Sequence, residues 1–332
     1  MTGAETARAP TAYGVREAAA RIAPYAVATP LLENADLNAR ARGRVLMKAE
    51  IFQHGGSFKF RGAMNRLLRL TEPERRAGVV AWSSGNHAQG VARAAKILGV
   101  RATIAMPRDA PANKIDQVRA FGGEIVFFDR YTEDREAIGR AIAEKSGAAL
   151  APSFDHVDII EGQGTLALEA AAQAAAAGAA LAAFVFCCGG GGMAAGGATI
   201  LEAVSPATRI RIAEPEGFDD AARSLASGEI VRADISRKTL CDALATPALG
   251  ALTFPVLQRR SAVGVAVSDD EVEDAMRFAF RELKLALEPG GAAALAAVLA
   301  GKISAAEGPL AITLSGGNVD PDLFSRIVSR KN

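Results

Sequence analysis

The chain has 332 residues, of which 50% are hydrophobic and 23% are charged, and its formal net charge at pH 7 is +1. This length fits about two globular domains, and the longest apolar runs, of about ten residues, are half of what a membrane-spanning helix needs. The balanced charge excludes the strong basic field of a dedicated nucleic-acid or membrane-surface binder.

The three cysteines, two of them adjacent, have neither the spacing of a disulfide framework nor that of a zinc site. Residues 1–12 contain no apolar run of the kind that a secretory signal has. We therefore expect a cytoplasmic protein whose first residues form a frayed tail.

Short apolar or β-branched runs alternate with longer helical patterns along the chain. Strands are predicted at residues 78–82, 101–106, 124–129, 181–188, 209–213 and 309–314. Helices are predicted at residues 86–98, 112–121, 132–146, 164–177 and 269–285, the last opened by a capping box of Ser268 and Glu271. Repeated strand-then-helix units are typical of parallel sheets in an α/β fold.

In such sheets, ligands bind outside the carboxyl ends of the strands, so the segments that follow strands are the candidate sites. Three stand out: residues 83–87 (SSGNH), 189–192 (GGGG) and 315–318 (SGGN). Four residues without a Cβ before a predicted helix leave backbone amides free to bind an anion, which favours a phosphate cradle over a merely flexible turn. Neither a Walker loop nor a clean dinucleotide fingerprint is present, which indicates a phosphate compound smaller than ATP or NAD.

Lys59 lies between Phe58 and Phe60 and close to several glycines. Partial desolvation in such surroundings lowers the pKa of a lysine and makes its amine a nucleophile. A solvated helix lysine is the alternative interpretation, but that interpretation predicts polar neighbours rather than two phenylalanines.

Five motifs occur in the order found in the serine/threonine dehydratases and serine racemases, which the chain resembles from about residue 22 onward. They are SFKFRGA at 57–63, SSGNHAQG at 83–90, GGGG at 189–192, EPGGA at 288–292 and SGGN at 315–318. Members of this family are pyridoxal-phosphate enzymes with the tryptophan-synthase-β-like fold, also called fold type II. The resemblance implies a homodimer of two-domain α/β subunits, in which a small domain of residues 81–155 is inserted into a large domain of residues 1–80 and 156–332.

The resemblance also implies roles for the motif residues. Lys59 is expected to join pyridoxal phosphate covalently, with Phe58 against the ring and Asn86 hydrogen-bonded to the 3'-oxygen. Ser315 is expected to face the pyridine nitrogen, where a hydroxyl does not keep the nitrogen protonated as a carboxylate does, so the ring is a milder electron sink. The expected phosphate-binding residues are Gly189, Gly190, Gly191, Gly192 and Met193.

The implied activity is that of an ammonia-lyase, which converts a β-hydroxy amino acid such as L-serine, L-threonine or 3-hydroxyaspartate to a 2-oxo acid and ammonia, with Lys59 taking the α-proton. A serine faces the lysine across the substrate in the racemase-like branch, so Ser84 either makes racemisation an alternative activity or simply caps its helix. Arg135 either binds a second substrate carboxylate, as in some relatives, or lies on a solvated helix face. The expected substrate-binding residues are Ser83, Ser84, Asn86, His87 and Arg135.

A metal site is also implied by the resemblance. Glu214, the Phe218 carbonyl and Asp220 match the spacing at which metal-activated members hold Mg²⁺ or Ca²⁺, although a solvated acidic turn has the same composition. Residues 241–244 read CDAL where the family usually has Ala/Gly-Asp-Gly, and we expect Ala243 to narrow the site or alter its specificity. A non-catalytic relative that holds an anion in the glycine loop is the alternative of another class.

Overall fold

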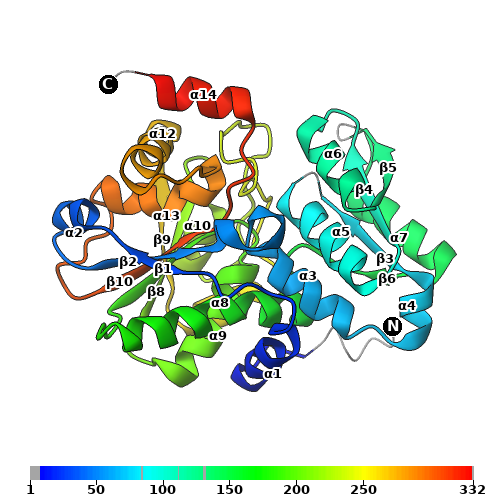
Figure 1. Ribbon diagram of the computed structural model, residues 1–332, viewed down its shortest axis with the longest axis horizontal. Coiled ribbons are helices and arrows are strands. Elements are labelled where there is room, and N and C mark those ends of the chain that lie inside the picture. Colours follow the sequence, from blue (N-terminus) through cyan, green and yellow to red (C-terminus); the bar gives the residue numbers. More distant parts are fainter. Residues whose placement is uncertain (1–7, 84, 111, 130–131, 331–332) are drawn as a thin grey trace.

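The computed structural model describes residues 8–83, 85–110, 112–129 and 132–330, and of Asn113 only the backbone. Its strands form one six-stranded and one four-stranded sheet (Figure 1). The larger sheet has the order β1 (Leu31–Glu33), β2 (Val45–Ala49), β10 (Leu310–Leu314), β7 (Ala183–Cys187), β8 (Arg209–Pro215), β9 (Val263–Val267). The smaller sheet has the order β5 (Glu124–Phe128), β4 (Ala102–Pro107), β3 (Val79–Trp82), β6 (Ala149–Leu150).

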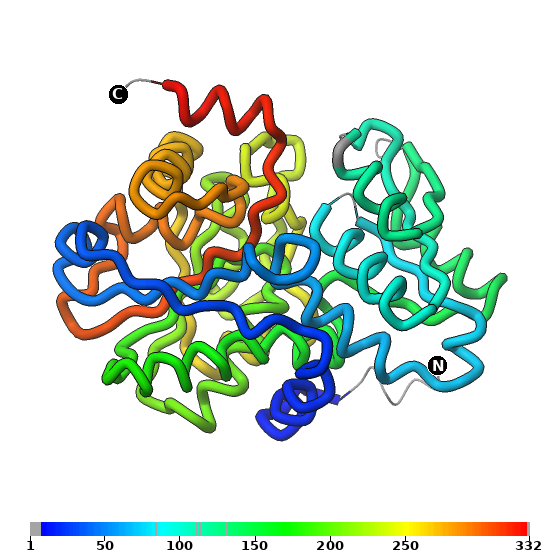
Figure 2. The backbone as a smooth tube through the Cα atoms, viewed as in Figure 1, coloured from blue at the N-terminus to red at the C-terminus, as the bar shows by residue number. Residues whose placement is uncertain are grey.

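All described strand pairs are parallel except that of β1 with β2. Figure 2 shows β2, from the N-terminal part of the chain, running beside β10, from the C-terminal part, although the N and C ends themselves lie far apart. The parallel-rich α/β class expected from the sequence is therefore what the structure has.

Helices cover both sheets in layers. They are α1 (Ala12–Ile22), α2 (Ala35–Ala41), α3 (Lys59–Leu68), α4 (Glu72–Ala77), α5 (Asn86–Leu98), α6 (Ala112–Ala120), α7 (Arg135–Ser146), α8 (Val157–Ala176), α9 (Gly192–Val204), α10 (Asp220–Ser227), α11 (Thr253–Arg259), α12 (Asp269–Phe278), α13 (Pro289–Leu299) and α14 (Pro321–Ser329). Short 3₁₀ turns η1 (Glu50–Phe52) and η2 (His54–Gly56) precede α3, and a π turn η3 (Ala279–Leu283) follows α12.

The layer between the two sheets positions the functional site. Helices α8 and α9 lie along one face of the larger sheet and α13 packs on the other, while α5 and α7 pack against the smaller sheet (Figure 1). Helix α3 packs against both α5 and α8, so it lies between the two sheets. Whatever α3 carries at its N-terminus is therefore presented to both halves of the molecule.

The six predicted strands and five predicted helices are confirmed, with shifted ends. Helix α8 begins at Val157 instead of residue 164, and α12 ends at Phe278, after which the backbone continues as η3. The prediction of a frayed tail is wrong for the residues from Arg8 onward, because the Arg8 guanidinium donates to both oxygens of Glu161 at 2.6 and 2.7 Å. The backbone N–H of Thr11 donates to the same carboxylate.

Glycines set the distance between α3, α8 and α9. A Cβ on Gly162 would lie 2.8 Å from the carbonyl oxygen of Arg61, and a Cβ on Gly164 would lie 2.6 Å from that of Gly196. Real Cβ atoms do not approach backbone this closely, so these helices touch at their backbones. The start of α3 is thereby held at a fixed distance from α8.

A buried group of charges fixes the orientation of α3. The fully buried Arg61 guanidinium donates to Glu50 at 2.8 and 2.9 Å and to Glu169 at 2.7 and 2.9 Å. Lys48 of β2, also fully buried, donates to Glu169 at 2.8 Å. Two cations therefore balance two carboxylates, which is the arrangement that makes buried charge tolerable.

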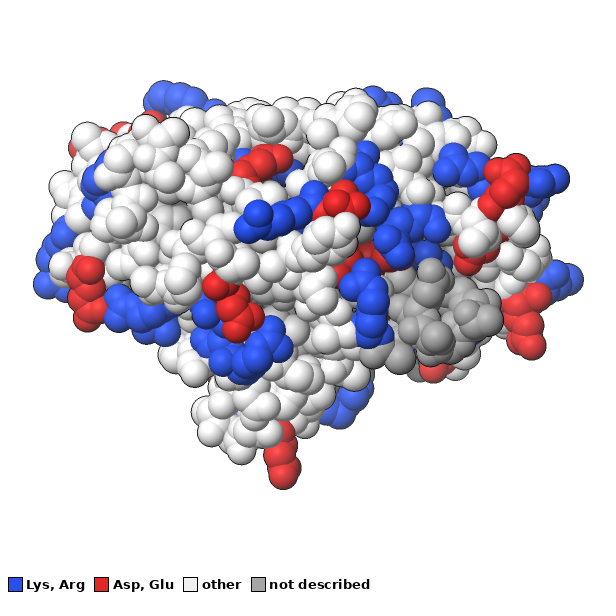
Figure 3. All heavy atoms as spheres, turned by 90° about the horizontal axis from the view of Figure 1, so that it is seen from below, with Lys and Arg blue, Asp and Glu red and all other residues white. Residues whose placement is uncertain are grey.

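Charge on the surface is mixed. Figure 3 shows basic and acidic side chains interspersed over one face of the molecule, in keeping with a net charge of +1. Among the described residues, no helix combines the length and the apolar character that crossing a membrane takes.

Candidate active site

The sheet order brings three of the sequence motifs together. Strands β2, β10 and β7 are neighbours, and parallel strands end at the same edge of a sheet. The chain after β2 leads to Lys59, the chain after β10 begins with Ser315, and the chain after β7 leads to Gly189. Ser83, directly after β3, and Asn86 and His87, at the start of α5, approach from the smaller sheet.

One pocket contains the cofactor and substrate residues predicted from the sequence, as far as they are described. Its lining includes Phe58, Lys59, Ser83, Asn86, His87, Arg135, Gly189, Gly190, Gly191, Gly192, Met193 and Ser315. Ser84, the predicted second catalytic residue, lies outside the described residues. The predicted metal-binding residues do not line this pocket.

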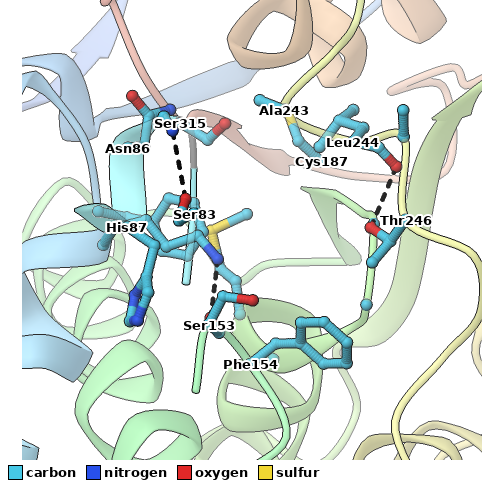
Figure 4. A pocket seen from close by; sticks show the side chains of 18 of the residues that line it. Ser83, Asn86, His87, Ser153, Phe154, Cys187, Ala243, Leu244, Thr246 and Ser315 are labelled. Carbon is cyan, nitrogen blue, oxygen red and sulfur yellow. Dashed lines mark hydrogen bonds between the residues drawn. The ribbon is translucent and has the colours of Figure 1, made fainter. Parts of the chain in front are cut away.

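Lys59 is the first residue of α3, and its side chain reaches into the pocket. Its Nζ donates a hydrogen bond of 2.8 Å to the carbonyl oxygen of Ser153 (Figure 4) and lies 5.2 Å from the centre of the Phe58 ring. Burial lowers the pKa of Lys59 to about 8, against the opposing effect of the nearby Glu288 carboxyl. A far larger fraction of this amine than of an ordinary lysine is therefore unprotonated, and nucleophilic, near neutral pH.

The four glycines form a cradle in which no side chain fits. Gly191 has a φ of 86°, and a Cβ there would lie 2.7 Å from Leu249. A Cβ on Gly190 would lie 2.5 Å from the ring of Phe154. No side chain caps the N-terminus of α9, which follows directly. Bare backbone and an uncapped helix N-terminus are the features that bind phosphate.

Asn86 is fixed from two sides at the start of α5. Its Nδ2 donates a short hydrogen bond to Glu288, and its Oδ1 accepts one of 2.8 Å from Asn318. Burial and the charge of Asp242 raise the pKa of Glu288 to about 7. These contacts leave the Asn86 amide with a single orientation toward the pocket.

His87 is buried and neutral. Its Nε2 lies 2.7 Å from the carbonyl oxygen of Ala151, and because a carbonyl only accepts, this nitrogen carries the proton. Burial and the charge of Lys59 lower the pKa of His87 to about 3. The ring therefore adds no positive charge to the pocket.

The opposite wall belongs to the segment between α10 and α11. Figure 4 shows Ala243 and Leu244 across the pocket from Asn86 and His87. Asp242 precedes them and accepts a 2.6 Å hydrogen bond from Lys114 of α6. The exposed Arg135, at the start of α7, also lines the pocket, and α7 packs against the smaller sheet.

The predicted metal-binding residues lie together at the end of β8. The Glu214 carboxylate accepts hydrogen bonds of 2.9 and 2.8 Å from the backbone of Ala221 and Ala222. Burial raises the pKa of Glu214 well above its usual value and that of Asp220 to about 6. Oδ2 of Asp220 is buried without a hydrogen-bond partner. In the described part of the chain, no group of three or more His, Cys, Asp or Glu side chains could hold a metal ion.

Some site residues received no role from the sequence. Glu288 and Asn318 belong to recognised motifs, but their contacts with Asn86 come from segments far apart in the chain. Ser153 contributes only a backbone carbonyl, which sequence cannot single out. Lys114 resembles an ordinary helix lysine, and only its pairing with Asp242 distinguishes it.

Comparisons with known proteins give matches over nearly the whole chain. The family model described as "Pyridoxal-phosphate dependent enzyme" matches residues 22–316. The L-threo-3-hydroxyaspartate ammonia-lyase of Pseudomonas sp is 42% identical, over 95% of this chain and 98% of its own length. The structure of maize serine racemase is similar with a TM-score of 0.91 at 38% identity, covering 96% of this chain and 97% of that one. The structure of a T.th. threonine deaminase has a TM-score of 0.87 at 43% identity, covering 94% of this chain and 99% of that one.

In protein stripped of bound small molecules, we expect Lys59 to react with an amine-acylating reagent at a rate that is half-maximal near pH 8. The unprotonated amine is the nucleophile, and burial disfavours the ammonium, so the reaction rate rises at lower pH than for an ordinary lysine of pKa about 10.4. Peptide mass spectrometry over a pH series measures this, with Lys59→Ala as the control for peptide assignment. A Lys59 profile that coincides with the average of the other lysines would contradict the description.

Replacing Gly191 by alanine should abolish stabilisation of the protein by inorganic phosphate and cost about 1–3 kcal/mol of unfolding free energy. The matched control is Gly178→Ala, which also places alanine at positive φ, 68°, but with no atom within 4 Å of the new Cβ. It should keep the phosphate response. Thermal unfolding with and without phosphate separates the two variants, and an equal response in both would argue against the cradle.

Proposed function

Because the chain belongs to the family of pyridoxal-phosphate dependent enzymes, we propose that it is an ammonia-lyase that converts a β-hydroxy amino acid to a 2-oxo acid and ammonia. The observation that carries the proposal is the presence of a desolvated lysine amine and a glycine cradle in one pocket. The relative named L-threo-3-hydroxyaspartate ammonia-lyase, 42% identical over nearly the whole chain, supports 3-hydroxyaspartate as the first substrate to test, beside L-serine and L-threonine.

The pocket residues fit pyridoxal phosphate. The cofactor supplies an aldehyde that condenses with an amine and a ring that withdraws electrons from the substrate α-carbon. Lys59 offers the amine, and the cradle of Gly189 to Gly192, followed by Met193, offers phosphate-binding amides. Phe58 lines the pocket beside Lys59 and offers a flat apolar surface to the ring.

Two polar residues orient the ring. Asn86, held by Glu288 and Asn318, has a second Nδ2 hydrogen to offer the 3'-oxygen. Ser315 offers the pyridine nitrogen a hydroxyl, which does not hold a proton there as a carboxylate does. Elimination of a β-hydroxyl needs less electron withdrawal than transamination, so this environment favours the proposed reaction.

Lys59 also acts as the base of the reaction. Its Nζ, whose pKa burial lowers to about 8, takes the α-proton of the substrate in its unprotonated form. The hydrogen bond from Nζ to the Ser153 carbonyl gives the amine a defined resting position when it carries that proton. The β-hydroxyl leaves as one molecule of water, and the later hydrolysis consumes one molecule of water. The net products are therefore a 2-oxo acid and ammonia.

The start of α5 is the proposed site for the substrate α-carboxylate. No side chain caps this helix, so its first backbone N–H groups are left for a ligand, and Ser83, Asn86 and His87 beside them line the pocket. Arg135 is the proposed ligand of a second carboxylate, which 3-hydroxyaspartate has and serine lacks. Its guanidinium suits a carboxylate, and its position at the pocket edge suits the far end of the substrate.

Serine racemisation is the second candidate activity. It is supported by the similarity to maize serine racemase, and for it we propose Lys59 and Ser84 as the two bases. The third alternative, a relative that binds an anion without chemistry, gives no reason for an amine with a depressed pKa beside the cradle.

A divalent cation, Mg²⁺ or Ca²⁺, is the proposed ligand of Glu214, the Phe218 carbonyl and Asp220. The unpartnered Asp220 Oδ2 and the carboxylate of Glu214 are the hard oxygen donors that these ions prefer. With two carboxylates and one carbonyl, water must complete the coordination shell.

Assembly as a homodimer and a cytoplasmic location are also part of the proposal. So are the domain limits, with residues 81–155 as the small domain and residues 1–80 and 156–332 as the large one. The four-stranded sheet, which runs from Val79 to Leu150, supports that division.

We expect the reconstituted protein to release 2-oxo acid and ammonia from L-threo-3-hydroxyaspartate faster than from L-serine or L-threonine, and faster than it forms the other enantiomer of any of them. Coupled assay of the 2-oxo acid and chiral chromatography measure the two activities. Lys59→Ala should lose activity by at least about 10²–10⁴-fold. Enantiomer formation in excess of 2-oxo acid would favour the racemase, and neither product from any substrate would refute both.

Removal of divalent cations by a chelator should lower the Tm by a few degrees, and added Mg²⁺ or Ca²⁺ should restore it. A cation at about 100 times its Kd stabilises the folded state by about 2.7 kcal/mol. Asp220→Asn should lose this response, whereas Asp116→Asn, which removes an exposed carboxylate on α6, should keep it. If chelation changes neither stability nor activity, these residues form only an acidic turn.

A further inference from the structure

Lys114 and Asp242, which both line the active-site pocket, form an ion pair. Lys114 belongs to α6, which packs with the four-stranded sheet, and Asp242 belongs to the segment that forms the opposite wall. Their Nζ–Oδ2 distance is 2.6 Å, and both residues line the pocket. The mechanism proposed above uses neither of them.

Lys114 lies beside the proposed α-carboxylate site. A Cβ built on Gly85, at the start of α5, would have the Lys114 Nζ 3.8 Å away. A helix N-terminus and an ammonium both favour a negative charge at this place. In this structure the ammonium pairs with the protein's own Asp242, and the Glu288 carboxyl of the same pocket also interacts with its charge.

The two partners differ in burial, and this decides which can leave the pair. The Lys114 side chain is 10% exposed and that of Asp242 is 58% exposed. Returning the Asp242 carboxylate to water costs little, whereas an ammonium in a largely buried position needs a counter-charge. A carboxylate arriving in the pocket can therefore replace Asp242, and a ligand without a spare carboxylate leaves the pair intact.

From this asymmetry we propose that Lys114 is a specificity-determining residue for substrates with a second carboxylate. The Asp242 carboxylate pairs with Lys114 until the second carboxylate of such a substrate replaces it. In 3-hydroxyaspartate the second carboxylate is two carbons from the first, so a cation beside the α-carboxylate site can reach it. Arg135 is exposed, so its charge is screened by water and it discriminates less between ligands. The inference rests on the proposed function, of which it names the substrate class.

The experiment compares two ligands that lack a β-hydroxyl, L-aspartate and L-alanine, by calorimetric titration of the cofactor-loaded protein. Asp242→Asn removes the internal competitor and should tighten aspartate binding about 2- to 5-fold without a matching gain for alanine. Lys114→Met should weaken aspartate binding about tenfold or more and affect alanine much less. Lys114→Arg, which keeps the charge, should restore most of the preference.

The matched control is Asp116→Asn on the same helix, since Asp116 pairs loosely with Arg119 at 3.8 Å and does not line the pocket. Asp116→Asn should change the affinity for neither L-aspartate nor L-alanine. Equal shifts for aspartate and alanine in the Asp242 and Lys114 variants would mean that the pair only holds the pocket in shape, and would overturn the proposal. So would an unchanged ratio of the two affinities in either variant.

The KM values for L-threo-3-hydroxyaspartate and L-serine should follow the same pattern as the affinities. Because neither titration ligand has a β-hydroxyl to lose, the binding comparison stands apart from the lyase reaction. Binding that discriminates as expected, without release of a 2-oxo acid from any substrate, would refute the lyase and leave the role of Lys114 in place.

Discussion

The buried guanidinium of Arg61 is the constraint on which the position of the reactive lysine depends. It lies two residues after Lys59 and bonds one carboxylate that follows β2 and another on α8. Burying an arginine this deeply is tolerable only while both carboxylates stay in place. The start of α3 is therefore tied at once to the edge of the large sheet and to the helix that covers it, and the Lys59 amine inherits that precision.

The parts of the site that the sequence predicted are those that follow strands. The SSGNH, GGGG and SGGN segments stand directly after apolar runs, and parallel sheet geometry gathers such segments at one edge. The glycine cradle was predictable because four glycines in a row are unusual where a strand meets a helix. Lys59 was identified by its phenylalanine neighbours and by the family resemblance, since a lone lysine carries little information.

The parts that the sequence did not predict depend on contacts between distant segments or on weak local patterns. β1 and β6 have three and two residues, too short for a periodic signal. Helix α8 was predicted to begin at residue 164 and begins at Val157, and Gly162 and Gly164 inside it allow close helix packing. Three hydrogen bonds of the site join residues more than one hundred positions apart. They are those of Asn86 with Glu288, of Asn86 with Asn318 and of Lys114 with Asp242.

The glycine contacts among α3, α8 and α9 also limit how this protein can be engineered. Replacing a helical glycine by alanine commonly raises the free energy of unfolding by about 1 kcal/mol, because the unfolded chain loses conformational freedom. At Gly162 and Gly164 the added methyl group would instead meet the backbone of the next helix, and the helices would have to separate. The absence of a side chain at these two glycines thus serves the catalytic geometry and rules out stabilisation by alanine at the same positions. Stabilising substitutions should be sought at other positions, such as the exposed loops.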